Sequence, residues 1–154
     1  MRIYWRVSDH ADLTGEGGRK AGAHWHTAGS RIVYMAESPV AALVETLVHL
    51  DVDPEDMPDL YTLLRISSPD ELSIQALDPP TGTEWKRDLE LTRSLGDAWL
   101  ASVQSPLARV PSVIAPCSWN YLLNPAHSDA KQVRIVEVTR ERFDPRLFRF
   151  STRD

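Results

Sequence analysis

The stretch RIVYMAESPVAALVETLVHL, residues 31–50, contains in direct succession the signals of a strand, a tight connection and a helix. Residues 31–36 have the aromatic and β-branched side chains typical of a strand. Ser38 is a favourable N-cap, and Pro39 would occupy the first helical position, where its missing N–H costs nothing. Residues 40–50 contain no helix breaker. The stretch therefore predicts a strand that leads directly into a helix.

Apolar side chains cover most of the circumference of this predicted helix, which predicts that it is buried on several sides. The positions concerned are Val40, Leu43, Val44, Leu47 and Val48. One narrow face differs, because Glu45 and His49 stand there one turn apart among small residues. A carboxylate on such a helix needs a partner or a chemical role. It belongs either to a structural ion pair with an arginine elsewhere or to a functional site.

The bulk composition is that of a globular protein with one domain over residues 1–154. The chain has 154 residues, 42% of them hydrophobic and 25% charged, and a net charge of −5. This negative charge argues against direct nucleic-acid binding, which favours a basic surface. No apolar run approaches a membrane span, and the opening residues do not resemble a signal peptide, so we expect a cytoplasmic protein. Cys117 is the only cysteine, which excludes an internal disulfide.

The remaining segments mix strands and helices without strict alternation, which favours the α+β class. Strands are predicted at 2–7, 60–67, 72–77, 108–115 and 133–138. Residues 84–103 are predicted to be helical, with Gly96 splitting them into two helices. The predicted irregular segments are a long loop at 8–27, a connection at 51–59, an apolar hook at 120–125, and a turn with a terminal apolar piece at 143–150.

The loop at 8–27 is rich in glycine and polar residues, and a loop of this length in a small domain is usually functional or mobile. Its composition suits wrapping a ligand, but it lacks both the GxGxxG and the GxxxxGK[ST] patterns of nucleotide-binding loops. His24, Trp25 and His26 form an aromatic, titratable cluster near its end. The two histidines are either ordinary surface residues or part of a site. No third and fourth ligand stand at a suitable spacing, so no metal site is predicted.

Several segments together resemble a known family. They are the opening YWR, the loop ending GAHW, the strand RIVYMAES, the helix ALVETLVHL, and the later VPS, NYLLNP and FDPRLF. This pattern, which covers nearly the whole chain in order, is similar to the RES-domain toxins of bacterial type II toxin–antitoxin modules, often encoded beside an Xre-like antitoxin. The resemblance implies a fold like that of the diphtheria-toxin-type ADP-ribosyltransferases, with a central twisted mixed β-sheet flanked by helices.

The resemblance also implies an enzyme that consumes NAD⁺ by hydrolysis or phosphorolysis of the nicotinamide–ribose bond, with phosphate as a candidate co-substrate and no permanent cofactor. One alternative is transfer of ADP-ribose to a host protein. The implied partners are a cognate Xre-like antitoxin and, within a larger complex, a second copy of the chain. The family's active-site tyrosine, glutamate and serine fall on Tyr34, Glu45 and Ser112, and its arginine near the first strand falls on Arg6.

One position departs from the family pattern. Relatives usually have arginine in the motif that here reads Gly22-Ala23-His24-Trp25. Arginine is a permanently charged, bidentate clamp for phosphate, and histidine is neither. Either Arg19 or Arg31 replaces it, or His24 does a weaker version of the job, or the chain is a less active form. The last possibility keeps open a second alternative, an inactive binding module.

The chemistry of the residues agrees with the implied reaction. Cleavage of an N-glycosidic bond builds oxocarbenium character on ribose, which a carboxylate such as Glu45 stabilises. Tyr34 can stack on nicotinamide or donate its hydroxyl, and Ser112 can hydrogen-bond ribose or the amide. Taken singly, however, these two residues suit a core tyrosine and a turn serine equally well. The predicted catalytic set is Glu45, Tyr34, Ser112 and His24, and the predicted NAD-binding set is Arg6, Arg31, Trp25, Ser38 and His49.

Overall fold

The predicted unit of strand, connection and helix forms strand β2 (Val33–Ala36) and helix α2 (Pro39–His49) in the computed structural model, which describes residues 1–50 and 53–148. The Ser38 hydroxyl oxygen accepts a hydrogen bond from the Ala41 N–H at 3.1 Å and so caps the helix. Pro39 is the first helical residue, as predicted. The tight connection sets the direction in which α2 leaves the sheet, and therefore where Glu45 lies.

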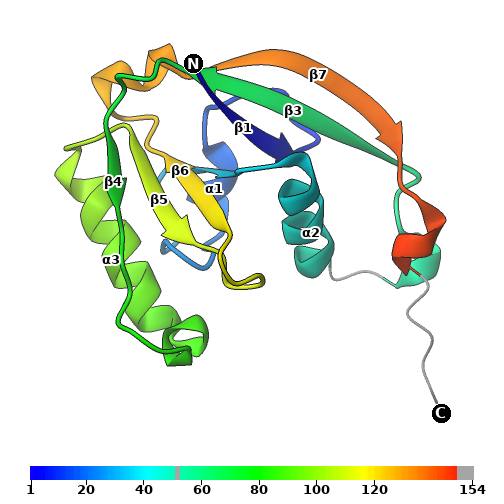
Figure 1. The fold of residues 1–154 in the computed structure, drawn as a ribbon, viewed down its shortest axis with the longest axis horizontal. Coiled ribbons are helices and arrows are strands. Elements are labelled where there is room, and N and C mark those ends of the chain that lie inside the picture. The colour runs from blue at the N-terminus through cyan, green and yellow to red at the C-terminus, as the bar shows by residue number, and fades with distance from the viewer. Residues whose placement is uncertain (51–52, 149–154) are drawn as a thin grey trace.

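A seven-stranded mixed sheet with the order β4-β5-β6-β2-β1-β3-β7 forms the centre of the protein (Figure 1). Only β4 and β5 pair in parallel; every other neighbouring pair is antiparallel. The α+β class and the mixed sheet are therefore confirmed. The strands other than β2 are β1 (Arg2–Val7), β3 (Leu60–Ser68), β4 (Ile74–Ala76), β5 (Leu107–Pro111), β6 (Trp119–Leu123) and β7 (Arg134–Arg142).

The core lies on both faces of the sheet, because neighbouring residues of one strand pack into different clusters. On β6, Leu123 belongs to a cluster with Tyr4 and Leu64, whereas Leu122 belongs to a cluster of tryptophans. The second cluster is covered by helix α3 (Leu89–Ser102), which contributes Trp99 and Leu100 to it. β3 and β7 continue beyond this layered part as a long two-stranded ribbon (Figure 1).

The strand predicted at 108–115 ends at Pro111, because a turn follows there. Three further segments differ more strongly from their predictions. Helix α1 (Glu16–Lys20) forms inside the predicted loop, starting after Gly15, whose φ of 72° lies in the left-handed region. The predicted apolar hook is strand β6, which pairs with both β2 and β5. Helix α3 runs unbroken through Gly96, because that glycine is a site of close packing and not a helix end. Residues 1–50 and 53–148 also contain four 3₁₀ helices: η1 (Pro54–Asp56), η2 (Glu84–Arg87), η3 (Ser128–Gln132) and η4 (Pro145–Phe148).

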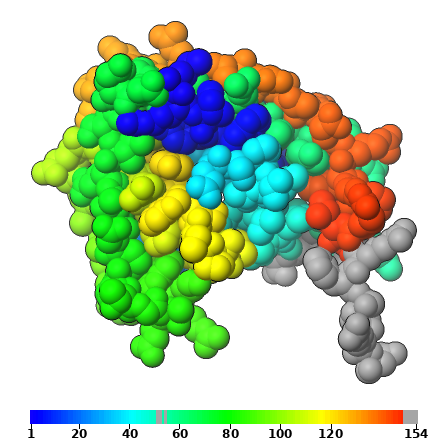
Figure 2. All heavy atoms as spheres, in the orientation of Figure 1, coloured from blue at the N-terminus to red at the C-terminus, as the bar shows by residue number. Residues whose placement is uncertain are grey.

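The prediction that α2 is buried on several sides was wrong. Val40, Val44 and Val48 are 69%, 37% and 59% exposed, and Ala42 is the helix's one buried residue. These valines recur every four residues and so form one stripe, which we call the valine stripe. The helix packs on β1 and β2 through its opposite side, so the stripe faces outward. Figure 2 shows α2 uncovered between the β5–β6 connection and η4.

No helix in the described part of the chain is long and apolar enough to cross a membrane. Residues 51–52 of the predicted connection at 51–59, and residues 149–150 of the predicted terminal piece, lie outside the described residues. Within the described part of that piece, the predicted turn at Asp144 and Pro145 leads into η4.

Candidate active site

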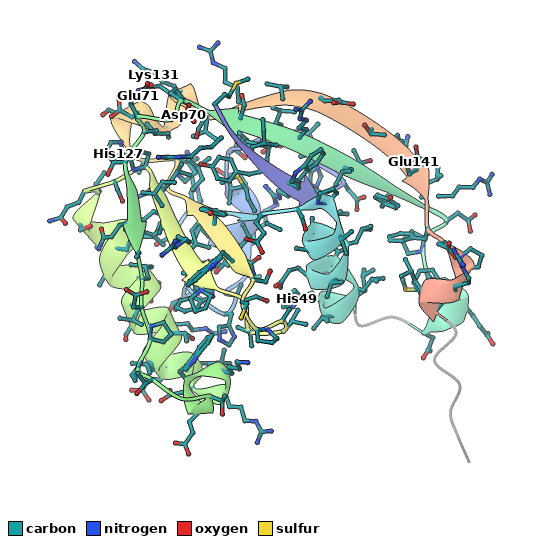
Figure 3. All side chains as sticks on the ribbon, in the orientation of Figure 1. His49, Asp70, Glu71, His127, Lys131 and Glu141 are labelled. Carbon is teal, nitrogen blue, oxygen red and sulfur yellow. The ribbon has the colours of Figure 1, made fainter. Side chains whose placement is uncertain are left out.

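A pocket of about 580 Å³ lies between the glycine-rich loop, α2 and the strands β1 and β2. Six residues of the predicted site line it together: Arg6, His24, Trp25, Tyr34, Glu45 and His49. They come from β1, the loop, β2 and α2, so the fold brings together residues that span more than forty positions of the sequence. Figure 3 shows His49 projecting from α2 on the side of the β5–β6 connection.

The Glu45 carboxylate is held by two neutral donors. Asn120 Nδ2 and Ser112 Oγ donate hydrogen bonds to its Oε1, at 2.7 and 3.2 Å. Oε2 lies 3.8 Å from His49 Nε2. No arginine in the described ranges 1–50 and 53–148 forms an ion pair with Glu45, so the geometry does not support the structural ion pair considered as an alternative. The carboxylate is therefore oriented at one oxygen while the other faces His49.

Ser112 and Asn120 orient the Glu45 side chain through hydrogen bonds to its Oε1. Ser112 is 5% exposed, and its Oγ also accepts hydrogen bonds from the N–H groups of Ile114 and Ala115, so it organises the turn after β5 as well. Asn120 on β6 was not predicted. The orientation of its amide is fixed, because only the NH₂ group can donate to a carboxylate. Asn120 also lines the pocket.

Tyr34 contributes its ring to the pocket, while its hydroxyl is engaged with the loop. The hydroxyl oxygen accepts a hydrogen bond from the Trp25 N–H at 3.2 Å and lies 2.7 Å from His26 Nδ1. Burial raises the pKa of Tyr34 well above its usual value. The phenol therefore stays protonated at physiological pH. It is suited to forming an apolar wall and to holding the loop, and not to transferring protons.

His24 lines the pocket in a setting that disfavours its charged form. Its ring packs edge-on against Trp25 and Trp85, with centroid distances of 5.7 and 6.5 Å. Burial, and then the nearby charge of Arg93, lower the pKa of His24, while Glu45 raises it. Its Nε2 is buried without a hydrogen-bond partner among the described residues. At neutral pH His24 is therefore an uncharged imidazole and cannot replace a permanent cation.

Helix α3 fastens the segment that carries His24 and Trp25. Thr92 Oγ1 donates to the His24 carbonyl at 2.6 Å, and Arg93 Nε donates to the Ala23 carbonyl at 2.9 Å. Gly96 lies directly beneath the Trp25 carbonyl: a Cβ added at Gly96 would meet that oxygen at 1.6 Å. All three contacts are to main-chain atoms of the loop. The path of this pocket wall therefore depends on a helix that lies about seventy residues away in the sequence.

The two arginines considered as replacement clamps lie elsewhere. Arg31 forms an ion pair with Glu16 at 2.6 Å, Arg19 lies 3.8 Å from the same carboxylate, and both line a second hollow. Arg6, in contrast, lines the main pocket, and its guanidinium forms no ion pair with the described residues. Burial lowers the pKa of Arg6, but an arginine stays charged at physiological pH.

Ser38 serves as the helix cap and does not line the main pocket. The described part of the chain contains no group of three or more histidine, cysteine, aspartate or glutamate residues placed to hold a metal ion.

Comparison with known proteins places the chain among RES-domain sequences. The model of the family described as RES domain matches residues 3–146. The chain is 46% identical to Toxin Res of Pseudomonas putida over 146 residues, which covers 95% of this chain and 99% of that protein. It is 36% identical to the Prs ADP-ribosylating toxin of a Sphingobium species over 157 residues, covering 95% of this chain and 96% of that protein.

A solved structure with a similar fold is the MbcT–MbcA toxin–antitoxin complex of M. tuberculosis. The TM-score is 0.71 at 20% sequence identity, covering 96% of this chain and 86% of the matched chain. At that identity the match supports the fold alone.

Proposed function

Since the chain belongs to the RES-domain family, we propose that it is the toxin of a bacterial toxin–antitoxin pair and that it depletes NAD⁺ by cleaving the nicotinamide–ribose bond. The single observation that carries the reaction is the Glu45 carboxylate, oriented by Asn120 and Ser112 at the wall of a pocket. The pocket is also lined by Arg6, whose guanidinium has no ion-pair partner among the described residues. A carboxylate fixed before the substrate binds stabilises positive charge without reorganising during the reaction.

The proposed reaction breaks the bond between ribose C1′ and the nicotinamide nitrogen. The bonding electrons leave with nicotinamide, which becomes neutral, and positive charge builds on the ribose carbon and ring oxygen. Glu45 stabilises that charge and accepts a hydrogen bond from a ribose hydroxyl. An oxygen of water, or of phosphate, then forms a bond to C1′, and the proton given up by the attacking water passes to solvent. Tyr34 and Trp25 supply aromatic surface for the planar nicotinamide, and Arg6 supplies positive charge for the pyrophosphate.

A relative that is called an ADP-ribosylating toxin gives one specific reason to consider a second acceptor. In that reaction a side chain of a host protein, and not water or phosphate, would attack C1′. The first half of the chemistry and the role of Glu45 would be the same. The two functions therefore differ in the acceptor and not in how this pocket handles NAD⁺.

The purified chain should release nicotinamide from NAD⁺. The test is incubation with NAD⁺, with and without phosphate, followed by separation of the products. Free ADP-ribose would indicate hydrolysis, and a phosphorylated ADP-ribose would indicate phosphorolysis. Transfer is tested by adding a lysate and NAD⁺ labelled in its ADP-ribose part, and label that stays on protein would indicate it. No nicotinamide release under any of these conditions would refute the enzymatic proposal and favour the inactive binding module.

His24→Arg is expected to raise nicotinamide release about 10- to 100-fold. An arginine would restore a charge-assisted contact to the NAD⁺ phosphates, worth about 1.5–3 kcal/mol. The matched control is Arg31→Ala, which should leave the rate unchanged because Arg31 is bound to Glu16 beside another hollow. A silent His24→Arg together with an inactive Arg31→Ala would show that the clamp is Arg31.

The pH profile tests the same idea. Because burial lowers the pKa of His24, it gains a proton only below its ordinary value of about 6.5. Any gain in activity from protonated His24 should therefore begin below that value. The folded state binds this proton more weakly than the unfolded state does, so acidification through that range also removes stability. The melting temperature of His24→Arg should fall less on acidification than that of the unmodified chain.

We also propose that a cognate antitoxin covers the valine stripe. Val48 belongs both to the stripe and to the pocket lining, so a partner seated on the stripe would also reach the pocket mouth. Purification from the native operon should yield a second chain. Val44→Glu should weaken that association at least tenfold while nicotinamide release stays unchanged, because Val44 is outside the pocket. Recovery of this chain alone, or full association of the variant, would contradict the proposal.

A further inference from the structure

His26 is a buried histidine that the proposed chemistry does not use. Its side chain lies between the glycine-rich loop and β2, and the residue is 1% exposed. The loop histidines could have been ordinary surface residues, but for His26 the structure rules this out. Both ring nitrogens have partners: Nε2 lies 2.9 Å from the Gly18 carbonyl oxygen and Nδ1 lies 2.7 Å from the Tyr34 hydroxyl.

The directions of these hydrogen bonds follow from the chemistry of the partners. A carbonyl oxygen only accepts, so His26 Nε2 carries the hydrogen, and in the neutral ring Nδ1 must then accept from the Tyr34 hydroxyl. The Tyr34 oxygen in turn accepts from the Trp25 N–H. The four groups form one chain of donors that runs from the Trp25 N–H through Tyr34 and His26 to the Gly18 carbonyl.

The chain of hydrogen bonds joins three parts of the pocket wall. Gly18, Trp25 and Tyr34 all line the pocket, and they come from α1, the end of the loop and β2. The backbone at Gly18 is also closely packed, since a Cβ there would meet Ile32 Cγ2 at 2.6 Å. Among the residues that the structure describes, His26 is the one side chain hydrogen-bonded both to the α1 end of the wall and to Tyr34.

We propose that His26 is a positioning residue that latches the glycine-rich loop onto Tyr34 and so sets the shape of the nicotinamide-binding end of the pocket. These hydrogen bonds hold the loop in the free protein, whether or not NAD⁺ is bound. Its consequence for NAD⁺ turnover rests on the proposed function.

Two substitutions each remove one of the two hydrogen bonds of His26 and keep the other. Asparagine places an oxygen near the position of Nδ1, so His26→Asn keeps an acceptor for Tyr34 and loses the bond to Gly18. Glutamine places an NH₂ group near the position of Nε2, so His26→Gln keeps the donor to Gly18 and loses the acceptor. The matched controls are His10→Asn and His10→Gln, since His10 is exposed and lies outside the pocket.

Amide hydrogen exchange in the absence of NAD⁺ tests the latch directly. His26→Asn should speed exchange over residues 15–21 about tenfold, because one hydrogen bond that closes this segment is lost. His26→Gln should leave that segment close to the unmodified rate. Neither variant should change exchange in β5 and β6. Unchanged exchange over residues 15–21 in His26→Asn, or a rise spread evenly over the whole chain, would overturn the proposal.

Kinetics supply a second readout that a general loss of stability would not reproduce. His26→Asn should raise KM for NAD⁺ about tenfold with kcat little changed, because the wall opens while Tyr34 stays held. His26→Gln should lower kcat about tenfold, because the Tyr34 hydroxyl loses its acceptor. Adding Tyr34→Phe should then cost less than Tyr34→Phe costs alone, because only the hydrogen bond from the Trp25 N–H remains to be lost. Equal effects of both variants on kcat and KM would overturn the proposal. If exchange changes as expected but the unmodified chain releases no nicotinamide, the latch stands and the proposed function fails.

Discussion

Replacing Glu45 with glutamine is expected to lower the rate of nicotinamide release about 100- to 1000-fold, the effect typical of losing one preorganised electrostatic contact with the transition state. Glutamine keeps the shape of the side chain, and its carbonyl oxygen can still accept from Asn120 and Ser112. The negative charge is lost, so the positive charge that builds on ribose is no longer stabilised. The melting temperature should change little, because the Glu45 side chain is 25% exposed and substitution opens no cavity.

The matched control is Glu37→Gln. Glu37 lies two residues before α2, accepts a hydrogen bond from Ser118 Oγ at 2.8 Å, and does not line the pocket. Its substitution removes the same charge from the same region and should leave the rate within about twofold, as is typical of exposed sites. If Glu45→Gln instead melted the protein while stable preparations kept full activity, Glu45 would be a structural residue.

Gly96→Ala is expected to destabilise the protein by about 2–4 kcal/mol, toward the upper end of what overpacking costs. The new methyl group would lie 1.6 Å from the Trp25 carbonyl oxygen and 2.8 Å from the carbonyl carbon. Because the obstacle is backbone, no side-chain rotation can relieve it, and the loop must move off α3. For a domain of this size the melting temperature should fall by about 6–12 °C. Nicotinamide release should fall as well, since the displaced segment carries Trp25 and His24.

Gly17→Ala controls for the change of residue type. Gly17 lies in α1, and nothing is within 4 Å of a Cβ added there. Alanine at a helical position without obstruction should be neutral or stabilise the protein by up to about 1 kcal/mol. Equal stability of Gly96→Ala and the unmodified chain, measured by chemical denaturation, would show that α3 does not fix the loop.

The parts of the fold that could be predicted are those encoded by neighbouring residues. β1, β2, α2 and β3 follow from local strand patterns, a cap and a proline. α1 could not be predicted, because a segment with two glycines among its five residues has little intrinsic helix preference. β6 was missed because its strand character comes from pairing with β2 and β5, partners that the local sequence does not reveal.

The predicted site divides in the same way. Glu45 could be predicted from the helix that carries it and Tyr34 from the family resemblance, and both line the pocket. Asn120 was missed because it lies 75 residues from Glu45 and in a segment predicted as a hook. Its one signal was a polar residue between two aromatic ones, Trp119 and Tyr121. Arg31 precedes β2 in the sequence, but its side chain is bound to Glu16, and sequence proximity alone could not show this.

The way α3 holds the loop has a consequence for how this protein can change over time. Thr92 and Arg93 donate hydrogen bonds to carbonyl oxygens of the loop, and the missing side chain of Gly96 leaves room for a third carbonyl. The contact between α3 and the loop therefore depends on main-chain atoms, which every amino acid possesses. Mutations at positions 23 and 24 can therefore alter the chemistry presented to the pocket without shifting the path of its wall. His24, which stands where the family resemblance leads us to expect arginine, is then a different side chain on an unchanged backbone. Neutral drift, and directed evolution of substrate preference, should be concentrated at these positions and nearly absent at Gly96.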